Sequence, residues 1–280
     1  MKRVVLSDRL LAAAAMVTVG SRVCDVGCDH GFVPIYLIEQ GISPAVLAMD
    51  VKSGPLSAAK EHIAEHGLEK VIETRLSDGL HNYNIGESDT LICAGMGGRL
   101  MTRILSDDKD KTESFRELIL QPQSEIEQFR AWLRGQGYRI TDENMIEEDG
   151  KFYPMMRVEA AEPAPGGVTC SYTEICKELK RKTAYGCPAA ISELNNTHNY
   201  MNDVELCKLC DRYGPLLLLC KNRTLKAFLK REEKIYQEIL SELQARGLSD
   251  DKRKNRYEEV QGLLEDCRKA LDIMTVDKLT

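Results

Sequence analysis

A run of small and acidic residues near the start of the chain has the composition of a ligand-binding turn. Residues 23–31 read VCDVGCDHG, in which a short apolar strand ends in an acid and a glycine turn then opens a helix. Gly27 and Gly31 let the backbone approach a ligand at the carboxyl edge of a sheet, where open α/β folds bind ligands. The run has neither the G-x-G-x-x-G pattern nor the K-[ST] ending of a phosphate-binding loop.

The charge of this turn indicates the class of ligand. Asp25 and Asp29 would repel a pyrophosphate, but they suit a cationic ligand at close range. S-adenosylmethionine carries a sulfonium and an ammonium group and no phosphate, so the sign of the turn favours it over a dinucleotide. The candidate cofactor-binding residues of the turn are Asp25, Gly27, Cys28, Asp29 and Gly31.

Three further motifs follow later strands in the order that this cofactor requires. Asp50 closes the second predicted strand, where a carboxylate can accept both ribose hydroxyls. Asp78 and Gly79 follow the third strand and are placed to contact an adenine edge. The sequence AGMGG after the fourth strand exposes backbone groups beside the reacting centre, with a methionine as an apolar wall. Its candidate cofactor-binding residues are Ala94, Gly95, Met96 and Gly97. Each motif alone is weak, but four in this order predict a methyltransferase.

The elements that position these motifs alternate along residues 1–160. Apolar strands are expected at 22–25, 45–50, 71–75, 90–93, 117–121, 138–146 and 152–158. Amphipathic helices are expected at 7–18, with Ser7 as a possible cap, and at 32–40, 55–66, 98–105 and 123–134. This alternation predicts an α/β fold, a doubly wound and mostly parallel Rossmann-like sheet that closes with an antiparallel hairpin.

The last third of the chain reads as helical. The proline- and glycine-rich segment 161–167 predicts a linker, and two long helices are expected at 221–245 and 251–274. Apolar residues at 257, 260, 264, 267, 271 and 274 alternate in steps of three and four, which favours an antiparallel coiled-coil hairpin over an ordinary helical pair. We therefore expect a catalytic domain at 1–160, a linker and cysteine-containing insertion at 161–209, and a helical hairpin at 210–280.

The net charge of the 280 residues is −6, which excludes a globally basic nucleic-acid binder. The charge is unevenly distributed, because residues 1–160 have a net charge of −7 and residues 161–280 of +1. Between positions 220 and 256 there are eleven basic and six acidic residues. This basic segment predicts either a phosphate-contacting surface or an ordinary solvated helix face.

Localisation follows from what the sequence lacks. No apolar stretch approaches the roughly 18 residues that span a membrane. The apolar run 10–19 could imitate a signal peptide, but Asp8 and Arg9 lie directly against it and no cleavage site follows. The ten cysteines are therefore expected to be reduced thiols of a cytoplasmic protein. Cys207 and Cys210 could form half of a zinc site with Cys176, Cys187 or His198, but free thiols are the favoured interpretation, so no metal is expected.

Several of these motifs together resemble the bacterial TrmK family, the tRNA methyltransferases that act on N1 of adenine 22. The matching segments are SDRL at 7–10, DVGCDHGFVP at 25–34, SDGL at 77–80, AGMGG at 94–98, LQPQ at 120–123 and GKFYP at 150–154, with RYGPLLL at 212–218 further on. The resemblance implies a class I methyltransferase domain followed by a helical coiled-coil domain. It also implies S-adenosylmethionine as cofactor and tRNA as partner, with no obligatory protein partner evident.

The resemblance also extends the set of candidate residues. Asp29 and His30 are the candidate catalytic residues, although His30 could instead only shape the loop. The candidates for contact with the target base are Arg9, Met96, Gln121, Pro122 and Tyr153, of which Tyr153 could equally be strand packing. Lys226, Lys230 and Arg231 would contact tRNA phosphates.

Two other functions fit the same residues. A class I methyltransferase for another RNA, a protein or a small molecule would share the cofactor residues and differ at the target site. An RNA-binding scaffold with a vestigial cofactor fold would lack turnover, and the intact DHG and GMGG segments argue against it.

Overall fold

The computed structural model describes residues 4–160, 178–179, 203–247 and 250–275. The chain divides into two compact units, Met1–Ser171 and Tyr172–Thr280. Helix α8 (Asp203–Tyr213) runs without a break across residue 210, where the sequence places the start of the last domain. The expected domain limits at 160 and 209 stay predictions.

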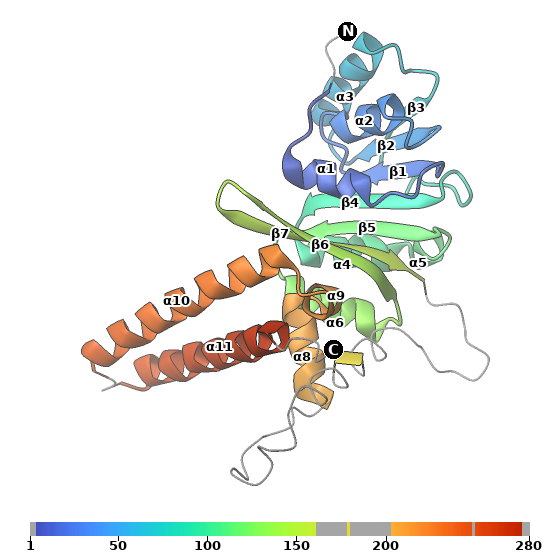
Figure 1. The fold of residues 1–280 in the computed structure, drawn as a ribbon. Coiled ribbons are helices and arrows are strands. Elements are labelled where there is room, and N and C mark those ends of the chain that lie inside the picture. The colour runs from blue at the N-terminus through green and yellow to red at the C-terminus, as the bar shows by residue number, and fades with distance from the viewer. Residues whose placement is uncertain (1–3, 161–177, 180–202, 248–249, 276–280) are drawn as a thin grey trace, which may run out of the picture. The chain divides into compact units, whose positions relative to one another are not determined.

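The first unit is built on a seven-stranded sheet with the order β3-β2-β1-β4-β5-β7-β6 (Figure 1). Its strands are β1 (Val23–Val26), β2 (Val46–Asp50), β3 (Ile72–Leu76), β4 (Thr90–Met96), β5 (Glu117–Pro122), β6 (Arg139–Glu148) and β7 (Lys151–Glu159). The strands β1 to β5 are parallel, whereas β7 pairs antiparallel with both β5 and β6. The predicted Rossmann-like, mostly parallel sheet with an antiparallel hairpin is therefore confirmed.

The strand order creates a switch point beside β1. Chain order runs outward from β1 through β2 to β3, and then returns to β4 on the other side of β1. The loops that leave β1 and β4 consequently diverge to opposite faces, and a crevice opens at the carboxyl ends of these two strands. The buried strands consist almost entirely of apolar residues, as expected for a sheet covered on both faces.

Helices cover both faces of this sheet. On one face, α1 (Asp8–Ala15), α2 (Phe32–Glu39) and α3 (Ser53–Glu65) share a core with alternate residues of the strands. On the other face, α4 (Gly98–Asp107), the short α5 (Lys109–Thr112) and α6 (Ile126–Gly135) pack with one another (Figure 1). Ser7 occupies the N-cap position of α1, but its side chain makes no capping hydrogen bond.

The described part of the second unit is helical. It contains α8, the short α9 (Pro215–Leu219), and the long helices α10 (Arg223–Ala245) and α11 (Asp251–Thr275), which lie side by side as an antiparallel pair (Figure 1). Val260, Leu264, Cys267 and Met274 of the expected seam are buried, while Tyr257 and Leu271 are only half-buried. Throughout the described ranges, no helix has both the length and the apolar composition needed to cross a membrane.

Candidate active site

A cavity of about 520 Å³ lies in the first unit at the carboxyl ends of β1, β2, β3 and β4. Its volume falls in the usual range for small-molecule sites. Most predicted cofactor residues line it: Asp25, Gly27, Cys28, Asp29, Asp50, Asp78, Gly79, Ala94, Gly95 and Met96. The lining also contains the candidate residues Arg9 and His30. Four consecutive strands thus deliver their motifs to one cavity, as the chain order predicts.

Asp25 is a buried acid at the end of β1. Asp25 lines the cavity, although the residue is only 4% exposed. Desolvation, and to a lesser extent the nearby Asp50 carboxylate, raise the pKa of Asp25 to about 7. A cation placed in the cavity would relieve both effects, because it would stabilise the charged form of this carboxyl group.

Asp50 ties two loops of the site together. Its Oδ1 accepts the backbone N–H of Lys52 at 2.8 Å, and its Oδ2 accepts the backbone N–H of Asp29 at 3.2 Å. The carboxylate is thereby fixed between the loop that follows β1 and the loop that follows β2. Each oxygen keeps a further lone pair, so the carboxylate can still accept the two hydroxyls of a ribose.

Gly27 brings the turn after β1 into close contact with the end of β4. Its φ of +79° lies in the left-handed region, and a Cβ atom there would be 2.2 Å from Cε of Met96. The N–H groups of Gly27 and Cys28 both donate to the carbonyl of Met49, at 2.8 and 3.0 Å. Only glycine therefore allows Met96 to lie directly against the turn.

The end of β4 contains a register shift. The pairing of β4 with β5 is irregular between Ala94 and Met96, which leaves Gly95 as the extra residue at a φ of +79°. Met96 is then in register with Pro122, so the predicted apolar wall and the predicted base-contacting turn are neighbours. Gly97 precedes α4 and does not line the cavity; a Cβ atom there would lie 2.9 Å from Oγ of Ser124.

Asp78 lines the cavity and forms an ion pair with Arg103. Both of its oxygens accept hydrogen bonds from Arg103, at 2.9 and 3.3 Å. Both side chains are about half exposed, so the pair is weak and open to exchange. Arg103 was not among the sequence candidates, and an isolated arginine on an amphipathic helix carries no signal that could have identified it.

The two candidate catalytic residues lie together at the cavity. Oδ1 of Asp29 and Nε2 of His30 are 3.7 Å apart, and both side chains are at least half exposed. Asp29 has a φ of +49°, in the left-handed region. The carbonyl of His30 accepts the Nδ1–H of His62 at 2.9 Å, so α3 fixes the backbone that carries this pair.

Arg9 and the residues that it contacts form a second polar cluster beside the cavity. Its Nη1 donates to Oε1 of Gln121 at 3.2 Å, and the Arg9 carbonyl accepts from Nε2 of the same glutamine at 3.2 Å. The guanidinium carbon lies 5.5 Å from the ring centroid of Tyr153. A Cβ atom on Gly95 would be 3.5 Å from Nη1. The structure thus brings together Arg9, Gln121 and Tyr153, although Gln121, Pro122 and Tyr153 do not line the cavity itself.

Several lining residues were not predicted. They are mostly apolar or basic and include Leu10, Phe32, Val51, Lys52, Pro55, Leu100 and Ile104. Their positions beside the glycine and acid motifs were the only available signal. Conversely, Gly31 lies outside the cavity lining and serves close packing instead, because a Cβ atom there would be 3.0 Å from Cβ of Ala59.

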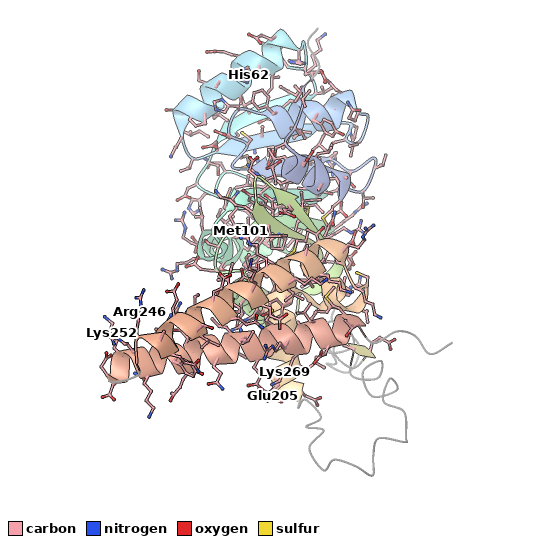
Figure 2. All side chains as sticks on the ribbon, turned by 60° about the vertical axis from the view of Figure 1, so that its left-hand side comes forward. His62, Met101, Glu205, Arg246, Lys252 and Lys269 are labelled. Carbon is pink, nitrogen blue, oxygen red and sulfur yellow. The ribbon has the colours of Figure 1, made fainter. Side chains whose placement is uncertain are left out.

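The predicted tRNA contacts lie on α10 in the second unit. Lys230 and Arg231 are exposed and Lys226 is half-buried. Arg246 and Lys252 stand at the tip of the α10–α11 hairpin (Figure 2). Some basic side chains of this hairpin are paired within it, as in the ion pair of Arg246 with Glu242 at 3.6 Å. Lys226 and Lys230 make no ion pair within the described ranges.

Three cysteines of the first unit, Cys24, Cys28 and Cys93, lie in the described ranges, and all three are buried. Desolvation raises the pKa of the Cys28 and Cys93 thiols, so neither is a ready nucleophile at neutral pH. Cys207 and Cys210 lie on α8, whereas Cys176, Cys187 and His198 fall outside the described residues. Among the residues that the structure describes, no group of three or more potential ligands could hold a metal ion.

Comparison with known proteins identifies the class first. Residues 6–156 match the profile of a family described as a methyltransferase domain, which is more than half of the chain. Together with the sheet order and the acidic cavity at the switch point, this match defines a class I methyltransferase.

The relatives identify the family. The tRNA (adenine(22)-N(1))-methyltransferase of Bacillus subtilis is 36% identical over 162 residues, which cover 58% of this chain and 68% of the relative. The crystal structure of the B. subtilis m1A22 tRNA methyltransferase TrmK is 27% identical, with a TM-score of 0.70 over 96% of this chain and 99% of that one. The chain belongs to the tRNA (adenine(22)-N(1))-methyltransferase family.

A third relative has been solved with its cofactor. A Streptococcus pneumoniae protein, provisionally assigned as a tRNA (m1A22) methyltransferase, is in complex with S-adenosyl-L-methionine. It is 26% identical to this chain, with a TM-score of 0.70 over 95% of this chain and 100% of that one.

Proposed function

We propose that this protein transfers the methyl group of S-adenosylmethionine to N1 of adenine 22 in tRNA. The observation that carries the proposal is the cavity at the switch point, where Asp25, Asp29 and Asp50 line the space and Arg9 lies beside Gly95. Family membership supplies the substrate class, because relatives of this sequence are named for this reaction.

The cavity fits this cofactor by shape and by charge. Gly27 and Met96, which lie against each other, both line the cavity, and no phosphate-binding motif is present. Asp50 would accept the ribose hydroxyls, and Asp25 and Asp29 would stabilise the positive groups of the methionine end. Asp78 and Gly79 would contact the adenine edge, while Ala94, Gly95 and Met96 would border the methyl group.

When bound, S-adenosylmethionine supplies an electrophilic methyl group on a positively charged sulfur. The attacking N1 lies on the Watson–Crick edge of adenine, so the target base must be unpaired or extruded before transfer. The N1 lone pair forms the new bond while the carbon–sulfur bond breaks toward sulfur, and the positive charge passes to the base. The contribution of the protein is to align N1 with the methyl group.

We infer that the residues around Arg9 hold the target nucleotide. The guanidinium of Arg9 would offer hydrogen-bond donors and the ring of Tyr153 a stacking surface. Met96 and Pro122, which are in register on β4 and β5, would supply apolar contacts. Asp29 and His30 also line the cavity, where they could accept a proton or stabilise charge on the methylated base. Lys226, Lys230 and Arg231 would contact phosphates elsewhere on the tRNA.

We place this reaction in the cytoplasm.

The test is methyl transfer from labelled cofactor to tRNA transcripts that differ only at position 22. We expect N1-methyladenosine in the transcript with adenine at this position and no label when guanine replaces it. Label in both transcripts would indicate a different target base. Absence of transfer to any tRNA, with cofactor still bound, would refute the proposed function.

The Asp29→Ala and His30→Ala variants test the catalytic residues within the same assay. Normal cofactor binding with reduced turnover supports a catalytic role for the residue concerned. Loss of cofactor binding would instead indicate that the residue only shapes the loop.

A further inference from the structure

Glu148 at the end of β6 reaches the candidate active site through Arg9. Its Oε2 lies 3.5 Å from Nε of Arg9, and its Oε1 accepts the backbone N–H of Arg9 at 3.4 Å. Glu148 therefore contacts both the side chain and the main chain of the same arginine, which is 139 positions away in sequence.

Arg9 is fixed from several directions at once. Gln121, whose side chain is fully buried, uses its amide oxygen on Nη1 and its amide nitrogen on the Arg9 carbonyl. The ring of Tyr153 lies against the guanidinium on another side. A free arginine side chain carries substantial rotamer entropy. Restraining it by a buried glutamine, a carboxylate and an aromatic ring indicates that its orientation at the cavity matters.

A fixed positive charge at this position conflicts with the chemistry of the site. The proposed cofactor carries a positive sulfur, and the methylated adenine becomes positively charged as transfer proceeds. Arg9 lines the same cavity, with Nη1 close to Gly95. An uncompensated guanidinium would repel both charges, because Coulomb repulsion over several ångströms is appreciable in a partly desolvated site. Glu148 is the carboxylate that contacts Arg9, and its side chain is only 19% exposed.

We propose that Glu148 is a positioning residue for methyl transfer, which rests on the proposed function. It orients Arg9 toward the target nucleotide and cancels the guanidinium charge. Arg9 can then hold the nucleotide without opposing the positive charge that moves from sulfur to base. Glu148 itself exchanges no proton and forms no bond in this reaction.

The test compares Glu148→Gln with Glu148→Asp and with a neighbouring control. Glutamine preserves the shape of the side chain but removes its charge, whereas aspartate preserves the charge. Glu147→Gln removes the same charge from an exposed position on the same strand, where consecutive side chains point to opposite faces. Thermal unfolding of each variant reports whether the fold is retained.

Binding of S-adenosylmethionine and of its neutral-sulfur product, S-adenosylhomocysteine, provides the diagnostic readout. In Glu148→Gln we expect the affinity for S-adenosylmethionine to fall about three- to tenfold more than that for the product, from the charge term alone. Turnover on tRNA should fall about tenfold or more, with little change in the KM for tRNA. Glu148→Asp should keep the wild-type ratio of the two affinities, and Glu147→Gln should match wild type throughout.

The double variant Arg9→Gln with Glu148→Gln tests the dependence on Arg9. If Glu148 acts through Arg9, the double variant should be no less active than Arg9→Gln alone. A loss of activity in the double variant equal to the product of the two single losses would overturn the inference. So would a Glu148→Gln variant that loses affinity equally for S-adenosylmethionine and for S-adenosylhomocysteine. If the wild-type protein makes no N1-methyladenosine, the proposed function itself fails. If it does and Glu148→Gln equals wild type, only this inference fails.

Discussion

The buried carboxyl group of Asp25 predicts a specific pH dependence of stability. An aspartate in an unfolded chain titrates near pH 3.8, whereas burial raises the pKa of Asp25 to about 7 in the folded protein. Between these values the folded state holds a proton that the unfolded state has released. The free energy of unfolding therefore falls as the pH rises through this window, and it becomes level above pH 7.

The magnitude follows from the two pKa values. Each pKa difference of one corresponds to 1.36 kcal/mol, so the full effect is about 4 kcal/mol. Between pH 5 and pH 7.5 the expected loss is about 2.5 kcal/mol, because part of the titration lies below pH 5. Arg75 lowers the pKa of Glu87 to about 2, and Arg22 lowers that of Asp89. These two carboxylates therefore contribute below about pH 4.5, outside the measured window.

The assay is urea unfolding of wild type and of Asp25→Asn, without cofactor, at several pH values from 5 to 8. The wild-type stability minus that of the variant should decrease by about 2.5 kcal/mol across the window. Asp29→Asn, which removes an exposed acid of the same loop, serves as the control and should run parallel to wild type. Saturating S-adenosylmethionine should shift the wild-type decline to lower pH, since a cation favours the charged carboxylate. Parallel curves for wild type and Asp25→Asn would refute the reasoning.

Three other variants have expected outcomes. Gly27→Ala would place a Cβ atom 2.2 Å from a methionine methyl carbon at a φ of +79°, so we expect about 1–3 kcal/mol lower stability in thermal unfolding; Gly54→Ala, with open space around its Cβ position, should lose none. Asp50→Asn should weaken cofactor binding in calorimetry by about tenfold or more, since a charged acceptor is lost, and unchanged affinity would argue against a ribose contact. Replacing Lys226 and Lys230 together by alanine should raise the KM for tRNA. It should also reduce the slope of the logarithm of the tRNA-binding constant against the logarithm of the salt concentration by about two. A change in cofactor affinity alone would contradict the assignment of these lysines to tRNA contact.

The fold was predictable because its elements carry local signals. Apolar runs such as VLAMD in β2 and turn pairs such as Asp149–Gly150 identify strands and their ends without knowledge of distant residues. The start of α6 was wrong by three residues, since Gly98 donates its N–H to the Ser124 carbonyl and Glu125 has a φ of +53°. The hydrogen bond from Gly98 comes from α4, a separate helix, so the local sequence pattern around residues 123–126 does not predict it. The four-residue α5 was too short to be expected.

The site was predictable where a motif follows a strand and unpredictable where a contact is long-range. The acids Asp25 and Asp50 could be placed at one edge because parallel strands end together. The contact between Arg9 and Glu148 depends on the antiparallel hairpin folding back toward α1, and no spacing in the sequence encodes it. The raised pKa of Asp25 likewise depends on burial that only the packed structure reveals.

The two backbone hydrogen bonds that Asp50 accepts have a consequence for release of the cofactor product. Because Lys52 and Asp29 hold this carboxylate before any ligand arrives, the ribose would meet a preformed acceptor and little loop ordering would be needed. The ribose and the adenine are identical in the cofactor and in its demethylated product. We therefore expect strong product inhibition. Removal of the product by other enzymes would then help determine how fast the tRNA is modified.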